Sequence, residues 1–289
     1  MDPQDGELAA TSDPQCHEDS YPYRIAAIRE CFEESGILLA RPKSKKSSLI
    51  ELNAVERQEG RKAVHSQGIT FPAFLEGLGA EADVEGLIPF TRWITPPNLP
   101  KRYTTQMYLY FLPIGSSHST LESSVKQQTA MPTTDGGIEH NAAHYLYPQE
   151  WLDLSLKKEI VLFPPQFILL SLIAPFLPQG NAPHDKIPDA EALLLQRQKL
   201  KQWVTSHGDP PWSEKCISPS TIETVKNEYI MMGLDKPGPE LEMSTRKGDS
   251  EWVLKVELDR EVEKGQKRPI PVELCKRDGA YAAPDKAKI

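Results

Sequence analysis

The chain has 289 residues, of which 39% are hydrophobic and 26% charged, an ordinary composition for a globular protein with a sizeable core. Its formal net charge of −8 argues against a nucleic-acid partner, because phosphate backbones require a clustered basic face. The four cysteines are scattered without C-x-x-C spacing, so neither a zinc site nor a disulfide framework is indicated.

The first predicted helix covers residues 22–35 and follows a polar stretch, residues 1–20, that we interpret as a loop. No apolar run preceded by positive charge occurs in that stretch, so the chain as given shows no secretory signal. One side of the helix carries an apolar stripe that favours burial. The stripe consists of Ile25, Ile28 and Phe32. Gly36 then supplies the left-handed residue that commonly ends a helix.

Three glutamates, Glu30, Glu33 and Glu34, stand at positions i, i+3 and i+4 of this helix, so they share one face. Like charges at this spacing cost a helix a few tenths of a kcal/mol per pair unless a cation gathers them. Their carboxylate oxygens are hard ligands that suit Mg²⁺ or Mn²⁺. Arg29 lies one turn before Glu33 and can hold that carboxylate in position. The spacing indicates either a divalent-metal site or an ordinary solvated acidic face.

The middle of the chain changes from helical to extended patterns. Residues 49–66, rich in Glu, Arg, Ala and Lys, predict an exposed helix, and a second short helix begins at Phe71. Residues 87–95 and 103–112 are aromatic and β-branched, as paired strands should be. The proline-rich residues 96–100 predict the loop between them.

Basic side chains gather in sequence around that loop: Arg92, Lys101 and Arg102. Arginine makes bidentate hydrogen bonds to phosphate, so these residues are candidates for binding an anionic substrate. The alternative is strand-edge charge that prevents aggregation. Trp93 and Tyr103 have rings that can stack on an adenine, although core packing is the more common use of such residues.

The later part of the chain carries no second catalytic motif. Residues 115–137 predict a long excursion, and the nearby pair His140 and His144 lacks the glutamate of an H-E-x-x-H metal helix. The most hydrophobic stretch, residues 160–177, is interrupted by prolines, whereas a membrane span needs about 20 unbroken apolar residues. We therefore predict no membrane span but a strand end followed by a short buried helix.

Further elements are predicted on either side of that stretch. A helix opens at residues 147–152, and an amphipathic helix covers residues 188–204 and ends at Gly208. Residues 251–258 and 269–274 predict a two-stranded β-ribbon. Such a pair is marginal alone, so we expect it to dock on the rest of the chain.

The segment Arg29-Glu30-Cys31-Phe32-Glu33-Glu34-Ser35-Gly36-Ile37 resembles the second half of the Nudix box, and every fixed position matches. The family pattern there is R-E-hydrophobic-x-E-E-x-G-hydrophobic. The resemblance extends to residues 92–96, 101–105, 135–139 and 163–167. Together these segments are similar to the Nudix subgroup related to peroxisomal acyl-coenzyme A diphosphatases, over roughly residues 5–175.

For the fold, the resemblance implies an α/β (α+β) class, with a Nudix-like mixed β-sheet flanked by helices in a hydrolase domain of residues 1–178. Residues 179–289 are then a C-terminal extension with a helix, the β-ribbon and a terminal tripeptide. The family box also has an upstream glutamate and glycine, where this chain has Tyr21 and Gln15. Members normally have strands and a Gly-Gly turn ahead of this point, so we expect a sheet truncated at the N-terminus. Either the chain begins at an internal methionine or it is a short form.

For function, the resemblance implies a metal-dependent hydrolase that cleaves a nucleoside-diphosphate linkage. The expected substrate is coenzyme A or an acyl-coenzyme A, cleaved to 3′,5′-ADP and (acyl-)4′-phosphopantetheine. One alternative is an NADH or ADP-ribose pyrophosphatase. Another is a catalytically inactive Nudix scaffold that binds a nucleotide or a protein, which the short N-terminus favours and the intact glutamates oppose.

The family roles carry over residue by residue. Glu30, Glu33 and Glu34 become ligands of Mg²⁺ or Mn²⁺, Arg29 orients them, and either Glu30 or Glu34 is the general base. Glu139 is a candidate further ligand. The basic group Arg92, Lys101 and Arg102 becomes a candidate site for the 3′-phosphate of coenzyme A.

The terminal tripeptide Ala287-Lys288-Ile289 is similar to the S-K-L class of peroxisomal addresses. Agreement with the subgroup resemblance predicts a peroxisomal import receptor as a partner and the peroxisome as the location. Without such a signal, the expected location is the cytoplasm.

Overall fold

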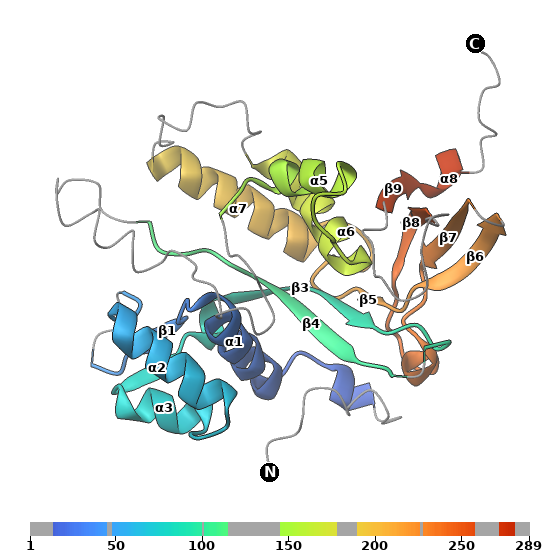
Figure 1. The fold of residues 1–289 in the computed structure, drawn as a ribbon. Coiled ribbons are helices and arrows are strands. Elements are labelled where there is room, and N and C mark those ends of the chain that lie inside the picture. The colour runs from blue at the N-terminus through green and yellow to red at the C-terminus, as the bar shows by residue number, and fades with distance from the viewer. Residues whose placement is uncertain are drawn as a thin grey trace. The chain divides into compact units, whose positions relative to one another are not determined.

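The computed structural model describes residues 14–44, 48–99, 101–114, 145–177, 190–225, 228–257 and 272–280. It combines helices and strands, which confirms the predicted α/β class (Figure 1). The chain forms two compact units. The helical unit comprises residues 19–89 and 108–145, and the larger unit comprises residues 1–18, 90–107 and 146–289. The predicted domain boundary at residue 178 lies outside the described residues and stays a prediction.

The helical unit contains the helix that carries the three glutamates. Its elements are α1 (Tyr21–Ser35), β1 (Ala40–Pro42), α2 (Ala54–His65), α3 (Phe71–Gly77), β2 (Ala80–Ala82) and the 3-10 turn η3 (Val84–Gly86). The short strands β1 and β2 pair antiparallel. The predicted helix over residues 22–35 is therefore confirmed. It ends as expected, because Gly36 adopts a φ of 73° and donates its N–H to Phe32 O at 2.8 Å.

Aromatic side chains form the centre of the helical unit. Phe32 of α1 is fully buried and stacks on Phe74 of α3, with 5.2 Å between ring centroids. Phe71 lies 6.5 Å from Phe32, measured between centroids. Ile28 is buried in the same core. The apolar stripe read from the sequence therefore anchors α1 and leaves the opposite side for charged residues.

The prediction that residues 49–66 form an exposed helix was wrong about its start and about its exposure. The helix begins later, at Ala54, with Asn53 as its N-cap, and it buries Gly60, Arg61 and Val64. These three positions recur at the spacing of one helix face. The charged composition concealed this face because one of its members is an arginine.

The described strands of the larger unit form two sheets. The first has the order β4-β3-β5 and is formed by β3 (Leu87–Ile94), β4 (Thr104–Tyr110) and β5 (Cys216–Ile217). It confirms the two strands predicted around residues 87–112. β3 and β5 are parallel, with Arg92 opposite Cys216. The chain passes between the two compact units within β3 and within β4.

The second sheet has the order β6-β7-β8-β9, and all its pairs are antiparallel. Its strands are β6 (Ser220–Val225), β7 (Tyr229–Leu234), β8 (Asp249–Glu257) and β9 (Val272–Lys276). The predicted ribbon of two strands corresponds to β8 and β9 and forms half of this sheet. The other half escaped prediction because β6 is mostly exposed and polar, with a register shift between Thr221 and Glu223.

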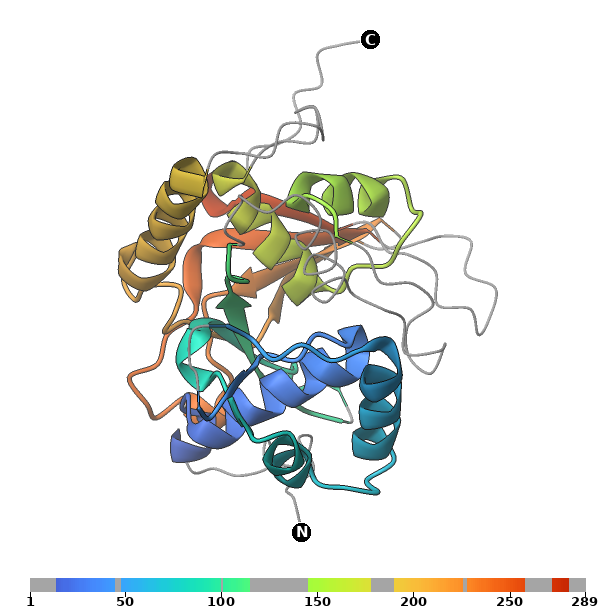
Figure 2. The same ribbon diagram turned by 90° about the vertical axis from the view of Figure 1, so that its left-hand side faces the viewer.

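Helices lie beside this second sheet, as Figure 2 shows for α6 and α7. The helices and 3-10 turns described in the larger unit are η2 (Pro14–His17), α5 (Pro148–Leu156), α6 (Pro164–Ile173), η4 (Ala174–Phe176), α7 (Ala190–Ser206), η5 (Pro239–Leu241) and α8 (Arg277–Ala280). α6 contacts β9. The predicted strand end near residue 160 is absent from the described segment, where α6 begins at Pro164. No helix in the described ranges has the length and apolar content to cross a membrane.

Candidate functional site

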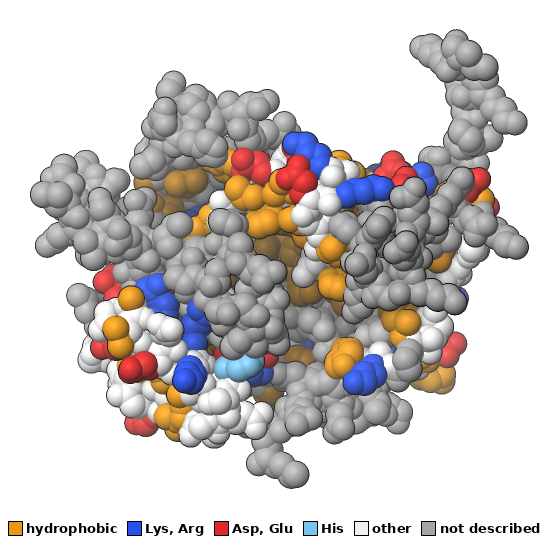
Figure 3. Space-filling view, viewed as in Figure 1, with side chains coloured by type: hydrophobic (Ala, Val, Ile, Leu, Met, Phe, Trp, Pro, Cys, Tyr) orange, Lys and Arg blue, Asp and Glu red, His pale blue; other side chains and the backbone are white. Residues whose placement is uncertain are grey.

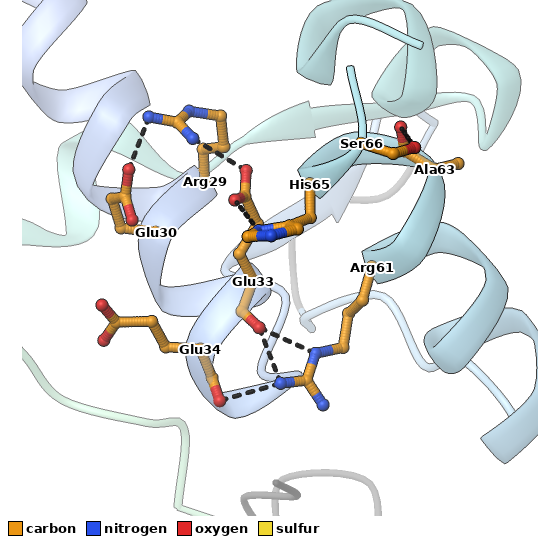
Figure 4. A network of polar contacts seen from close by, with 8 residues as sticks. All are labelled: Arg29, Glu30, Glu33, Glu34, Arg61, Ala63, His65 and Ser66. Atoms are coloured by element: carbon orange, nitrogen blue, oxygen red, sulfur yellow. Dashed lines mark hydrogen bonds and ion pairs between the residues drawn. The ribbon is translucent and has the colours of Figure 1, made fainter. Parts of the chain in front are cut away.

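The candidate site is the acidic face of α1, defined by Glu30, Glu33 and Glu34 in the last two turns of the helix. Arg29 joins two of these carboxylates (Figure 4). Its Nη1 donates to Glu33 Oε1 at 2.8 Å and its Nη2 donates to Glu30 Oε1 at 2.5 Å. The expected orienting contact between Arg29 and Glu33 is therefore present, and the same guanidinium also holds Glu30.

The three carboxylates differ in exposure. The Glu33 side chain is 9% exposed, the Glu30 side chain is 45% exposed, and Glu34 is exposed. In Figure 4 the Glu33 side chain points toward α2, whereas the Glu34 carboxylate points away from it. The acidic face thus offers two carboxylates to solvent and keeps a third one close to the protein.

His65 at the end of α2 also contacts the acidic face. Its Nδ1 lies 3.3 Å from Glu33 Oε2, so the two oxygens of Glu33 face two different basic side chains. Sequence reasoning missed His65 because it is 32 positions from Glu33. No short-range pattern could have connected these two residues.

Arg61, also on α2, was missed as well. It is buried, and it donates from Nε to Glu33 O at 2.9 Å and from Nη2 to Glu34 O at 2.8 Å. These are backbone oxygens at the end of α1, where a helix leaves carbonyl groups without intrahelical donors. A signal was present in the sequence, since glycine at position 60 inside a helix indicates a close approach of another element.

Cys31 lies within the same sequence motif but on a different part of the helix. Burial raises the pKa of its thiol, and its Sγ lies 3.6 Å from Ser35 Oγ. A thiol with a raised pKa is protonated at neutral pH, and metal ions bind the thiolate form. The carboxylates, and not this thiol, are therefore the candidate metal ligands of this helix.

The acidic face fits Mg²⁺ or Mn²⁺ in the type of its donors, since both ions prefer carboxylate oxygens. Within the part of the chain that the structure describes, no three Asp, Glu, His or Cys side chains converge on one point. The two oxygens of Glu33 face Arg29 and His65. The further ligand candidate Glu139 falls outside the described residues.

The predicted phosphate-binding residues all belong to the larger unit. Lys101 is exposed. Arg92 is buried in β3, and its Nη1 donates to Thr104 Oγ1 at 3.3 Å. Arg102 forms an ion pair with Glu240 and donates from Nε to Thr95 O at 3.1 Å. A role for these three in binding phosphate stays a prediction, and Lys101 has the most accessible side chain among them.

A cavity of about 670 Å³ lies within the larger unit. Its walls carry four aromatic rings, those of Phe167, Phe176, Trp203 and Trp252. In the space-filling view, hydrophobic side chains gather near α5, α6 and α7 (Figure 3). Such a lining suits an apolar group better than a phosphate.

Comparison with known proteins relates this geometry to a family. A family model described as the NUDT19 Nudix domain matches residues 9–173. The acyl-coenzyme A diphosphatase NUDT19 of Gallus gallus is 29% identical over 168 residues, which cover 53% of this chain. They cover 41% of that relative, so the chain spans about two fifths of its length.

A solved structure, that of a NUDIX hydrolase from Alicyclobacillus acidocaldarius, aligns with a TM-score of 0.39 and 21% identity. The alignment covers 54% of this chain and 63% of that one.

Proposed function

The chain belongs to the NUDT19 Nudix domain family of the Nudix hydrolases, and on that premise we propose that it cleaves a diphosphate linkage with the help of a divalent metal. The proposed substrate is coenzyme A or an acyl-coenzyme A, because the curated relative is named an acyl-coenzyme A diphosphatase. The products would be 3′,5′-ADP and (acyl-)4′-phosphopantetheine.

One observation carries this proposal. Arg29 holds Glu30 and Glu33 together on α1, at distances of 2.5 and 2.8 Å, in the turn that precedes Glu34. Three carboxylates therefore stand within two turns of one helix face, and Arg29 pairs with two of them. Because the Glu30 and Glu34 side chains are accessible, both can coordinate a divalent cation.

Each residue of the cluster has a distinct proposed task. Glu30, Glu33 and Glu34 hold the Mg²⁺ or Mn²⁺ ion, and Arg29 orients Glu30 and Glu33. When bound, the ion neutralises charge that develops on the diphosphate and makes a water molecule more acidic. A carboxylate oxygen of Glu30 or of Glu34 accepts the proton of the attacking water. Both are accessible enough to reach a solvent molecule.

The substrate class is tested by product analysis. The chain is incubated with Mg²⁺ or Mn²⁺ and, separately, with coenzyme A, an acyl-coenzyme A, NADH and ADP-ribose. We expect 3′,5′-ADP from the first two and slower turnover of the last two. Faster turnover of NADH or ADP-ribose would favour a pyrophosphatase of that kind. No turnover of any substrate would favour a binding scaffold.

The 3′-phosphate of coenzyme A is the proposed partner of Lys101 and Arg102. Lys101→Ala and Arg102→Ala should raise KM for coenzyme A and leave KM for dephospho-coenzyme A unchanged. Glu240→Gln is the matched control, because it disrupts the ion pair with Arg102 and keeps the cation. Equal KM changes for both substrates would contradict this assignment. Arg92→Ala is less informative because burial gives this residue a structural contact with Thr104.

We extend the proposal to location. The segment Ala287-Lys288-Ile289 lies outside the described residues, so its support is the sequence pattern alone. A fluorescent protein that ends in the last residues of this chain should enter peroxisomes through an import receptor. Removal of the tripeptide should return it to the cytoplasm, and an unchanged distribution would contradict the proposal.

A further inference from the structure

The last turn of α1 places two glutamates beside backbone oxygens that need donors. A helix cannot satisfy its final carbonyl groups internally. In α1, the Phe32 carbonyl accepts the Gly36 N–H at 2.8 Å. The next two carbonyls, of Glu33 and Glu34, belong to the residues whose side chains form the acidic face. Whatever holds these two peptide groups also sets the direction in which the carboxylates leave the helix.

Arg61 holds both groups. Its Nε and Nη2 donate to Glu33 O at 2.9 and 2.6 Å, and its Nη2 also donates to Glu34 O at 2.8 Å. Figure 4 shows the guanidinium facing these carbonyls from α2, with the Glu34 carboxylate on the far side. The positive charge also meets the negative end of the helix dipole. The arginine therefore acts on the main chain of the acidic face.

The packing of α2 brings Arg61 to this place. An added Cβ at Gly60 would lie 2.7 Å from Phe74 Cε2 and 3.4 Å from Phe32 Cζ, so only glycine permits this close approach. Val64, one turn later on the same face, is buried in the core. Asn53 fixes the start of α2, because its side chain accepts the N–H groups of Val55 and Glu56. Arg61 is thus presented by a capped helix with a defined contact surface.

We propose that Arg61 is a positioning residue for the glutamates of the acidic face. The inference rests on the proposed function in one respect, namely that Glu33 and Glu34 coordinate a divalent cation. Arg61 keeps the last turn of α1 in one conformation, from which the Glu33 and Glu34 side chains can turn toward a shared ion. Groups that orient metal ligands commonly change metal affinity by about 10- to 100-fold when they are removed.

The test measures Mn²⁺ binding directly, by the electron paramagnetic resonance signal of the free ion, with no substrate present. Arg61→Gln should weaken Mn²⁺ binding by about tenfold or more, in line with other ligand-orienting groups. Arg61→Lys keeps the charge but not the planar fork, so its affinity should fall between wild type and Arg61→Gln. Lys62→Gln removes a neighbouring exposed charge from the same helix and should leave the affinity within about twofold of wild type.

Val64→Ala separates positioning from general stability. It removes buried methyl groups from α2 and leaves the Arg61 contacts in place. The Mn²⁺ affinity of each variant is measured at the same number of degrees below its own Tm, so that the two variants are compared at a similar margin of stability. Under those conditions Val64→Ala should bind Mn²⁺ with the affinity of wild type, whereas Arg61→Gln should bind it more weakly. Equal weakening in both variants would overturn the positioning role.

The remaining outcomes distinguish this inference from the proposed function. A wild-type chain that does not bind Mn²⁺ would contradict the proposed metal site and the premise taken from it. If the wild-type chain and Arg61→Gln both bind Mn²⁺ with the same affinity, the positioning role of Arg61 is overturned and the proposed metal site stands. If Arg61→Gln does not fold, Arg61→Lys provides the comparison, and wild-type affinity in that variant would count against the role.

Discussion

The acidic face of α1 and the Lys215–Asp249 pair of the larger unit both place opposite charges close together, at 2.8 Å for Arg29–Glu33 and 2.6 Å for Lys215–Asp249. They differ in balance and in exposure. Lys215 and Asp249 match one charge with one charge, and their side chains are 7% and 2% exposed. The acidic face gathers three carboxylates beside Arg29, and the side chains of Glu30 and Glu34 are accessible to solvent.

The surroundings of the Lys215–Asp249 pair satisfy its remaining polar atoms. Asp249 Oδ1 accepts the N–H groups of Glu251 and Trp252 at 3.0 and 2.9 Å. Lys215 Nζ lies 4.7 Å from the centroid of the Trp212 ring. A closed pair of this kind holds the chain in place, whereas an open group of carboxylates can accept a ligand. The difference gives the Lys215–Asp249 pair a structural role and supports the metal binding proposed for the acidic face.

The largest expected effect is the loss of activity in Glu33→Gln. If the metal contributes several kcal/mol to the reaction, this variant should lower kcat/KM by about a thousandfold, or about 4 kcal/mol. Steady-state hydrolysis of coenzyme A measures it. Glu76→Gln is the control, because Glu76 is an exposed carboxylate of the same unit that pairs with the surface residue Lys43. A comparable loss of kcat/KM in Glu33→Gln and Glu76→Gln would contradict a specific role of the acidic face in activity.

Lys215→Ala should have the largest effect on stability. It leaves the buried Asp249 carboxylate without its cation, which typically costs about 3–5 kcal/mol. Urea denaturation followed by tryptophan fluorescence gives the free energy of unfolding. Mn²⁺ affinity should remain within about twofold of wild type, since this change touches no proposed metal ligand. A loss below about 1 kcal/mol in the free energy of unfolding would show that the buried pair stabilises the fold no more than an exposed ion pair does.

Asp83 forms a third polar cluster with Arg41 and Tyr110, and this cluster should make the stability of the protein depend on pH in acid. Burial of Asp83 acts to raise the pKa of its carboxyl group, but hydrogen bonds from Arg41 and Tyr110 outweigh it and lower that pKa. Because the folded-state pKa lies below the unfolded value of about 3.9, the stabilisation is present above that pH and is lost as the pH falls through the folded pKa. Urea denaturation between about pH 6 and 3 should show this loss in wild type.

The matched variant for this cluster is Asp83→Asn. It keeps the size of the side chain and has no carboxyl group to protonate, so its stability should fall less steeply in acid. Parallel curves for the two proteins would mean that Asp83 is not the group responsible.

The smallest effect is expected at an exposed ion pair. Lys276 and Glu251 lie 2.8 Å apart in β9 and β8, with side chains that are 56% and 60% exposed. Such pairs contribute between about 0 and 1 kcal/mol because water and salt screen them. Lys276→Ala should therefore change the free energy of unfolding by less than about 1 kcal/mol. A loss of stability as large as that of Lys215→Ala would contradict the claim that a buried ion pair stabilises the fold more than an exposed one.

The sequence predicted the parts of this molecule that depend on short-range spacing. The helix of residues 22–35, its end at Gly36 and the contact between Arg29 and Glu33 all follow from neighbours within one or two turns. The strands around residues 87–112 and the pair β8–β9 were recognised from their alternating and aromatic residues.

The missed parts depend on contacts between distant segments. Arg61 is 28 positions from Glu33, and its polar side chain suggested an exposed helix. The strand β6 has few buried side chains, so its partner β7 decides its conformation. Propensity and periodicity carry little information about such pairings, because tertiary contacts override them. Gly60 was the one local sign that α2 packs tightly against another element.

The most direct measurement is Mn²⁺ binding by the wild-type chain and by a Glu30→Gln/Glu34→Gln variant, using calorimetry without substrate. Removal of the two exposed carboxylates leaves Glu33 with Arg29 and His65, which is a balanced cluster similar to the Lys215–Asp249 pair. We expect that wild type binds Mn²⁺ and that the variant binds it at least about a hundredfold more weakly. Equal Mn²⁺ affinity in the two proteins would contradict the assignment of the metal site to the acidic face of α1.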